Sequence, residues 1–403
     1  MKFFLLKRIT PIALMIALLF TLLCPLASAV EGIVEINEDA TPVSDMGVAE
    51  GSLSLDCESA ILMEATTGTV IYTQNANAAL PPASVTKVMT LLLVMEAIDT
   101  GAIKLSDTVT ASATAASMGG SQIYLKEGEQ MVLEDLLKSV IIASANDAAV
   151  ALAEYLCGSV SVFVEKMNEK ARLLGMEDTV FENVTGLDDT AERHLTSARD
   201  IAMMSRELIK HKKVLEYSSI WMDTIRDGAF GLTNTNRLVR FYNGCTGLKT
   251  GSTSKAGFCV SVTAERDGFS LICVIMGAES RDVRNATATA LLDWGFASYG
   301  LYTAPAATLD PIRVSGGVKN LCALEAPAFS CVLPKADLSR VQESVLLPEF
   351  VSAPICTGDT VGTRTLRVQD RVIGEIPVRA AESVEKINFF VILGRMTAGF
   401  ALI

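Results

Sequence analysis

The sequence lacks the features that nucleic-acid-binding proteins and zinc proteins usually show. Its 403 residues hold 34 lysines and arginines against 46 aspartates and glutamates, so the formal net charge is -12. No basic run interrupts this acidic balance, which argues against a nucleic-acid partner. Histidine occurs only at His194 and His211, and no cysteine cluster lies near either one. We therefore expect no zinc site, no other metal and no cofactor.

A dense disulfide framework is also absent. Nine cysteines occur, one of them (Cys24) in the apolar N-terminal segment, and they form no CxxC pair. We therefore expect simple buried thiols, because free cysteine packs as a small hydrophobic side chain. One alternative stays open, since Cys259 and Cys273 lie in two adjacent apolar, strand-like runs and could face each other.

The N-terminus carries the pattern of a secretory signal. Three basic residues precede the apolar run Ile12–Leu23, and Ala27-Ser28-Ala29 offers the small residues that a signal peptidase reads. We predict a signal peptide over residues 1–29, followed by a flexible, acidic leader over residues 30–52. An uncleaved membrane helix is the alternative, although the apolar run is short and Pro25 interrupts it. The chain is therefore expected to be exported.

Apolar periodicity predicts an α/β fold for the larger part of the chain. Hydrophobic residues make up 50% and charged residues 20% of the sequence, so a substantial core is expected. The expected elements are strands 60–63 and 70–73, a helix from Ser84 to about Gly101, helices 133–143, 148–156, 160–174 and 197–210, strands 238–242, 257–264 and 270–277, and a helix 282–294. This order describes an α/β sandwich with a helical subdomain, which we place at residues 53–304.

From about residue 305 the sequence changes to short alternating runs with glycine and proline between them. Thr365–Val368 and Val372–Val378 flank a Gln369-Asp370 turn, as expected for a β-hairpin. We predict a small all-β C-terminal domain over residues 305–382.

The last residues, 387–403, are mostly apolar. At the helical period, Glu385, Asn388 and Arg395 fall on one narrow polar stripe. An amphipathic helix of this kind suits the membrane interface, so residues 384–403 are predicted to anchor the exported protein at the outer face of the cytoplasmic membrane. A short spanning helix would place Arg395 at a costly depth, and a helix docked on the protein itself is the third interpretation.

Three short motifs stand in order along the chain. They are Ser84-Val85-Thr86-Lys87, Ser144-Ala145-Asn146 and Lys249-Thr250-Gly251. Each is common by chance, but together they combine a nucleophile, a base, a proton relay and an anion clamp. The patterns S-x-x-K, S-x-N and K-T-G are a known signature of active-site serine enzymes that react with β-lactams.

The first motif can supply both nucleophile and base. A serine hydroxyl is a poor nucleophile until a base lies within hydrogen-bond reach. Lys87 follows Ser84 by about one helical turn, so both side chains can meet on one face. Its amine acts as a base only when uncharged, and both burial and a second cation, here Lys249, lower a lysine pKa. The N–H groups of Ser84 and Ser252 are candidates for the two donors that an acyl-transfer oxyanion needs.

The wider strings around the motifs are more specific. They are Pro82–Thr90, Gly119–Ser121, Ser144–Ala149 and Thr246–Thr253. From about Cys57 to Ser298, the chain resembles the low-molecular-mass penicillin-binding proteins, which are serine-type D-alanyl-D-alanine carboxypeptidases of bacterial cell-wall metabolism. The resemblance implies a β-lactamase/transpeptidase-like α/β sandwich, followed by the family's β-rich C-terminal domain and amphipathic anchor.

The resemblance also implies catalytic roles for four residues. Ser84 would attack the carbonyl between the two terminal D-alanines of a peptidoglycan stem peptide, and Lys87 would take the serine proton. Ser144 would relay a proton toward the leaving amine, while Asn146 would orient Lys87 and the substrate amide. Water would then release the shortened peptide, and β-lactam antibiotics would acylate the same serine as covalent inhibitors.

Substrate binding is implied for the third motif. Lys249 and Thr250 would hold the terminal carboxylate of the peptide, and Gly251 and Ser252 complete the substrate-binding set. Arg284 is a possible addition to the carboxylate site, but a salt bridge on the closing helix is the plainer interpretation.

Two other functions remain open. A secreted serine β-lactamase shares the motifs, but such enzymes usually end near residue 290, and class A members carry an E-x-x-L-N string. The nearest counterpart here, Glu192–Thr196, lacks the asparagine. A membrane-held peptidoglycan-binding scaffold with a decayed site is the second alternative, although every named catalytic residue is present.

Overall fold

The computed structural model describes residues 53, 55–187 and 191–400, with side chains described as far as residue 394. The predicted signal peptide, residues 1–29, and the predicted leader, residues 30–52, lie outside the described residues. The architecture is the expected α/β sandwich followed by a sheet-rich C-terminal region.

A five-stranded antiparallel sheet forms the middle of the sandwich, in the order β2-β1-β9-β8-β7. Its strands are β1 (Ser59–Glu64), β2 (Val70–Gln74), β7 (Cys245–Thr253), β8 (Gly257–Arg266) and β9 (Phe269–Ala278). Along β9, Ile272 and Val274 pack into one apolar core, whereas Leu271 and Cys273 pack into another. Both faces of the sheet are therefore buried, which explains why β8 and β9 read as continuous apolar runs.

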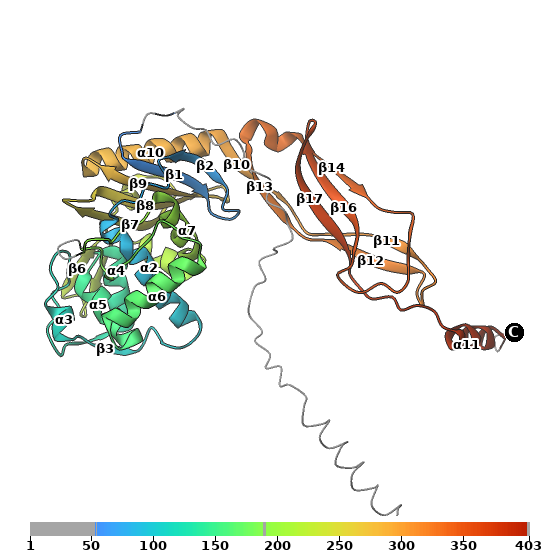
Figure 1. Ribbon diagram of the computed structural model, residues 1–403, viewed down its shortest axis with the longest axis horizontal. Coiled ribbons are helices and arrows are strands. Elements are labelled where there is room, and N and C mark those ends of the chain that lie inside the picture. Colours follow the sequence, from blue (N-terminus) through green and yellow to red (C-terminus); the bar gives the residue numbers. More distant parts are fainter. Residues whose placement is uncertain (1–52, 54, 188–190, 401–403) are drawn as a thin grey trace, which may run out of the picture. The chain divides into compact units, whose positions relative to one another are not determined.

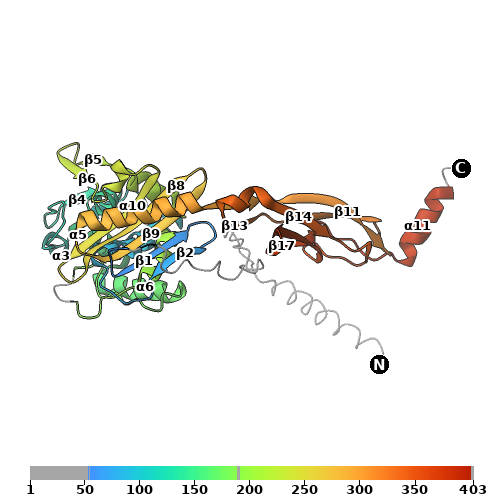
Figure 2. The same ribbon diagram turned by 90° about the horizontal axis from the view of Figure 1, so that it is seen from above.

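Helices cover the two faces of this sheet. Helix α10 (Arg281–Ser298) lies along one face, and a helical layer that includes α2 (Lys87–Asp99) and α7 (Ala198–Leu208) lies on the other (Figures 1 and 2). The remaining elements of this part are η1 (Ala83–Thr86), β3 (Thr108–Thr110), α3 (Ala113–Ala116), β4 (Gln130–Val132), α4 (Leu133–Ile142), α5 (Asn146–Cys157), α6 (Val160–Leu173), α8 (Lys212–Ser218), β5 (Met222–Ile225), β6 (Phe230–Thr233) and α9 (Leu238–Phe241).

The predicted strand 238–242 is wrong, because these residues form the helical turn α9. Asn236 Oδ1 accepts the N–H of Leu238 at 3.1 Å and starts the turn. Leu238 and Tyr242 then bury their side chains in the same core. Apolar residues four apart mark one side of a helix, and in so short a segment this pattern resembles a strand. The third motif lies within β7, a strand that the apolar runs did not predict.

The cysteines of the described residues are free thiols. Cys259 and Cys273 do not face each other, because Cys259 packs in the core shared with α2 and Cys273 in the core beneath α10. The two residues occupy neighbouring strands but point to opposite faces of the sheet, as alternation along each strand requires.

The C-terminal region is built from sheets around a third apolar core. A six-stranded sheet has the order β14-β16-β17-β12-β11-β15, and β10 pairs separately with β13. These elements are β10 (Tyr299–Ala304), β11 (Ala307–Ser315), β12 (Leu321–Ala326), β13 (Phe329–Pro334), η2 (Lys335–Arg340), β14 (Val341–Leu346), β15 (Phe350–Ser352), β16 (Thr360–Val368) and β17 (Arg371–Ala380). The predicted hairpin is confirmed, since Val368 of β16 pairs with Arg371 of β17.

The chain then enters helix α11 (Phe389–Phe400). Its first turns expose apolar side chains, with Phe389 69% and Phe390 79% accessible. The side chain of Arg395, which was predicted to join the polar stripe, lies outside the described residues. Among the described helices, none alone has the length and apolar run of a membrane span; α5 and α6 meet that test only as a pair bent by 86°.

Candidate active site

The nucleophile candidate sits in a tight turn at the start of α2. Ser84 lies in η1, and Lys87 is the first residue of the helix, with its Nζ 2.8 Å from Ser84 Oγ. The predicted meeting of these two side chains is confirmed. Strand β7 runs directly against the turn, because a Cβ on Gly251 would stand only 2.7 Å from the backbone nitrogen of Ser84. Glycine is therefore required at the end of the third motif, where two backbones touch.

The hydrogen bonds of Lys87 define the direction of its lone pair. Nζ donates to Asn146 Oδ1 at 2.6 Å and to the carbonyl oxygen of Thr185 at 3.0 Å. The amide of Asn146 is oriented by its own Nδ2, which donates to the carbonyl of Gly119 at 2.7 Å. Both of these oxygens can only accept hydrogen bonds, so an uncharged Lys87 donates its two N–H groups to them. Its lone pair then faces the hydroxyl of Ser84, as a general base requires.

Electrostatics favour this uncharged form. Lys87 is fully buried, and burial together with the neighbouring cation Lys249 lowers its pKa well below the usual value, against an opposing effect of Asp147. Lys249 is itself 1% exposed, and burial and the charge of Arg284 lower its pKa to about 7. The expectation that burial and Lys249 both act on Lys87 is confirmed.

The second and third motifs are joined by hydrogen bonds. Ser144 lies in the loop between α4 and α5 with a left-handed backbone, φ 63°. Its Oγ accepts from Lys249 Nζ at 2.8 Å, and the same amine donates to the Thr250 carbonyl at 2.9 Å. Thr250 Oγ1 in turn donates to Thr235 Oγ1 at 2.8 Å. A continuous polar surface therefore connects the hydroxyl of Ser144 to that of Thr250.

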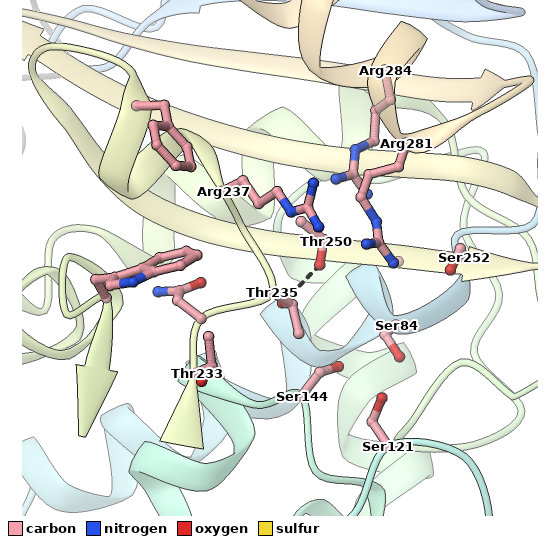
Figure 3. A pocket seen from close by; sticks show the side chains of 14 residues that line it. Ser84, Ser121, Ser144, Thr233, Thr235, Arg237, Thr250, Ser252, Arg281 and Arg284 are labelled. Atoms are coloured by element: carbon pink, nitrogen blue, oxygen red, sulfur yellow. Dashed lines mark hydrogen bonds between the residues drawn. The ribbon is translucent and has the colours of Figure 1, made fainter. Parts of the chain in front are cut away.

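These groups surround a cavity of about 610 Å³. The predicted residues that line it are Ser84, Ser144, Thr250, Gly251 and Ser252. The other predicted site residues, Lys87, Asn146 and Lys249, are buried behind this surface and reach it through hydrogen bonds. Figure 3 shows Ser84, Ser144 and Ser121 close together on one side of the cavity, with Thr250 opposite.

Arg284 does not form the predicted salt bridge on the closing helix. It is 2% exposed, forms no ion pair with any described carboxylate, and bonds only to Asn285 Oδ1 and the Cys259 carbonyl. It also lines the cavity, on the side of Thr250 (Figure 3). The alternative role, as an addition to a carboxylate site, is therefore the one that its position fits.

The loop that supplies Thr185 was missed by the sequence reasoning. Gly186 packs on the nucleophile turn so closely that a Cβ there would lie 1.8 Å from the Ala83 carbonyl oxygen. The loop returns at His194, whose Nε2 is 2.7 Å from Thr86 Oγ1 and whose Nδ1 accepts the N–H of Glu182. His194 is one of only two histidines, and this rarity was the one available signal.

The tautomer of His194 follows from these contacts. Thr86 Oγ1 already donates its single hydrogen to the Ala83 carbonyl, so it accepts from His194. Nε2 therefore carries the proton, and Nδ1 is free to accept from Glu182, in agreement with the second contact. The neutral imidazole thus fastens the loop to the turn that holds Ser84.

The chain is similar to proteins of known activity over most of its length. The family model described as D-alanyl-D-alanine carboxypeptidase matches residues 46–280, and the model of the penicillin-binding protein 5 C-terminal domain matches residues 310–386. D-alanyl-D-alanine carboxypeptidase DacF of Bacillus subtilis is 41% identical over 87% of this chain and 91% of its own length.

Solved structures agree with this similarity. Penicillin-binding protein 5 from Haemophilus influenzae superposes with a TM-score of 0.74 at 29% identity, over 83% of this chain and 99% of its own. Penicillin-binding protein D2 from Listeria monocytogenes, solved in its ampicillin-bound form, covers 60% of this chain and 99% of its own, with a TM-score of 0.56 and 32% identity.

We predict that Gly186→Ala slows acylation because the loop packs closely on the Ser84 turn, and not merely because alanine is strained in a left-handed backbone. The new Cβ must displace the Ala83 carbonyl and with it the Ser84 turn. Misplacing a reactive group by about 1 Å costs on the order of 100-fold in rate. The rate of covalent labelling by a fluorescent penicillin should fall by about that factor.

Gly128→Ala is the matched control. Gly128 has φ 77° against 82° for Gly186, but a Cβ there meets no atom within 4 Å. Both variants carry the same left-handed strain of roughly 1–2 kcal/mol, and only Gly186→Ala adds the clash with Ala83, so it should lose more stability in urea denaturation than the control. Labelling rates are therefore compared under conditions in which both variants are folded. Equal labelling by the two variants would show that the loop does not position Ser84.

Proposed function

The chain belongs to the D-alanyl-D-alanine carboxypeptidase family, and on that basis we propose that it removes the terminal D-alanine from peptidoglycan stem peptides through an acyl-enzyme on Ser84. The observation that carries this proposal is the position of the Lys87 amine, which lies 2.8 Å from Ser84 Oγ and donates to the oxygens of Asn146 and Thr185. Burial and Lys249 lower its pKa and so favour the uncharged form that can act as a base. No metal or cofactor enters the reaction that follows.

Acylation begins with proton transfer from Ser84 to Lys87. The serine oxygen attacks the carbonyl carbon of the penultimate D-alanine, and the negative charge on the carbonyl oxygen is taken by the N–H groups of Ser84 and Ser252. Gly251 brings strand β7 against Ser84 N, so these two donors belong to adjoining backbones. Fixed donors at this position stabilise the tetrahedral intermediate.

Departure of D-alanine needs a proton on its amine. Ser144 is suited to deliver this proton, because its hydroxyl lines the cavity and accepts a hydrogen bond from Lys249 Nζ at 2.8 Å. The free carboxylate of the leaving residue lies against Thr250, Lys249 and Arg284, and the Thr250 hydroxyl then donates to this carboxylate instead of to Thr235. This clamp confines the enzyme to peptides with a free C-terminus at that position.

Hydrolysis of the ester completes the reaction. Lys87 becomes uncharged again when its proton replaces the one that Ser144 gave to the amine. It then takes a proton from water, the resulting hydroxide attacks the acyl carbon, and Ser84 leaves as the alcohol with the proton that Lys87 returns. Asn146 keeps the amine in place through both steps, because its amide is itself held by Gly119. A β-lactam presents a carboxylate beside a strained amide and so acylates Ser84 in the same way, which agrees with the ampicillin complex of the relative.

Ser84→Ala is the direct test of the nucleophile. It should abolish D-alanine release from a D-Ala-D-Ala peptide, by at least about 10⁴-fold, together with labelling by a fluorescent penicillin. Ser161→Ala, at an exposed serine of α6, is the control and should retain both. Retained labelling of the Ser84 variant would show that another residue is the nucleophile. A wild-type protein that neither releases D-alanine nor takes label would be the scaffold, and rapid penicillin turnover would indicate a β-lactamase.

Lys249→Gln should move the pH dependence of acylation. The rate rises with pH as Lys87 loses its proton, and the Lys249 cation holds the pKa of Lys87 down. The neutral variant removes that cation, so the pKa of Lys87 rises and the increase in rate occurs at higher pH. Acylation should therefore fall more at pH 7 than at pH 9. Lys104→Gln, at an exposed lysine, should leave the profile unchanged, and a uniformly lower rate with an unmoved midpoint would contradict the prediction.

The location of the protein is a further part of the proposal. After export through the signal peptide 1–29, helix α11 lies in the membrane interface and holds the enzyme at the outer face of the cytoplasmic membrane. The exposed Phe389, Phe390, Ile392 and Leu393 support this, because they gain apolar contacts only outside the chain's own cores.

Removal of residues 389–403 should release the protein from membranes. The cut is placed after Asn388 because Val384 is buried and pairs with Ile355, so an earlier truncation would damage the sheet region. In fractionated cells the truncated protein should move from the membrane pellet to the soluble fraction while its activity on a soluble peptide is retained. Continued sedimentation with membranes would indicate an uncleaved N-terminal anchor instead.

A further inference from the structure

Three arginines converge on one side of the active-site cavity. Arg237 precedes α9, while Arg281 and Arg284 lie in the first turn of α10, and all three line the cavity with Thr250. Figure 3 shows their guanidinium groups pointing into the same space above Thr250. None of them forms an ion pair with a carboxylate of the described residues. In a chain of net charge -12, this is an unusual concentration of uncompensated positive charge.

The three cations repel one another. Burial and the charges of Arg281 and Arg237 lower the pKa of Arg284 to about 10. Lys249, whose pKa is lowered by Arg284, lies behind them. Like charges held together in a partly buried space are costly until an anion joins them. The cavity therefore favours the binding of an anion.

One carboxylate is too small an anion for this set of donors. A carboxylate accepts about four hydrogen bonds, whereas each guanidinium offers five N–H groups. Arg284 donates part of its N–H groups to Asn285 and Cys259, whereas the side chains of Arg237 and Arg281 form no hydrogen bond with a described residue. The amine of Lys249 is a further positive group on the same side, bonded to the Thr250 carbonyl. The terminal carboxylate of D-alanine would leave most of this capacity unused.

The cavity also extends beyond the clamp toward an aromatic pair. Trp221 and Phe241 line it, with ring centroids 6.2 Å apart in an edge-to-face arrangement, and Phe241 is 72% exposed. The guanidinium of Arg240 stands 5.5 Å from the Trp221 ring and 5.6 Å from the Phe241 ring, which fixes both. Arg237 and Phe241 flank the same short helix. This lobe gives room for a side chain longer than a methyl group.

We propose that the cavity is built for a leaving group with two carboxylates, namely a C-terminal D-residue whose side chain carries a second acid. Arg284 and Thr250, at the base of the cavity, take the α-carboxylate, and Arg237, on the rim, takes the side-chain carboxylate. The bond broken is still the amide after the acyl D-alanine, and water supplies the hydroxyl to the acid and the proton to the amine. The inference rests on the proposed carboxypeptidase function and adds to D-alanine a second class of leaving group at the same site.

Three synthetic peptides with the same acyl part test this assignment. They end in D-Ala-D-Ala, D-Ala-D-Glu and D-Ala-D-Gln, and the last matches D-glutamate in size without its charge. A charge-assisted hydrogen bond contributes about 1.5–3 kcal/mol, so kcat/KM for D-glutamate release should exceed that for D-glutamine release by roughly tenfold or more. In Arg237→Gln this ratio should fall to near one.

Arg313→Gln is the matched control, since it removes the same charge from an exposed arginine of β11 and should keep the ratio. Absence of D-alanine release from the first peptide would overturn the proposed function itself. Release of D-alanine with equal rates for D-glutamate and D-glutamine would overturn only this inference. The same would follow if Arg237→Gln slowed all three peptides alike, because the arginines would then merely attract anionic substrates.

Discussion

The site depends on one buried amine being kept without charge. A charged lysine inside a protein is costly unless it is paired, and Lys87 is hydrogen-bonded to two carbonyl oxygens and the Ser84 hydroxyl rather than to a carboxylate. The same two contacts stabilise the uncharged amine and direct its lone pair at Ser84. Burial would destabilise an ordinary charged lysine, but here it lowers the pKa of Lys87 and so favours the uncharged amine that can accept the serine proton.

The fold supplies the partners of this amine from distant parts of the chain. Asn146 begins α5, Thr185 belongs to a loop between α6 and α7, and Gly251 lies in the edge strand β7. Asn146 and Thr185 contact the amine itself. Gly186 and Gly251 approach the Ser84 turn so closely that a Cβ would clash with its backbone, and His194 fastens the loop to Thr86. The turn cannot shift without disturbing the sheet and the helical layer together.

Much of this arrangement could be predicted from sequence, because the motifs place the nucleophile, the base and the clamp at element ends with recognisable periodicity. The contribution of Thr185 could not, since it acts through a backbone carbonyl that any residue provides. The strand predicted at 238–242 failed for a related reason: a single helical turn capped by Asn236 has too few residues to show its period. Arg284 was misjudged because its burial beside the cavity depends on tertiary packing.

The cations around Lys87 also connect binding to catalysis. In the free enzyme Lys249 lowers the pKa of Lys87, and Arg284 lowers that of Lys249. A substrate carboxylate held against Thr250 offsets this positive field, so the pKa of Lys87 must rise when the peptide binds. Before binding, the lowered pKa favours the uncharged amine, and the bound carboxylate makes that amine a stronger base. A peptide without a free carboxylate at that position would not be held by these positive groups and would not raise the pKa of Lys87. Recognition of the carboxylate is therefore part of the chemical step.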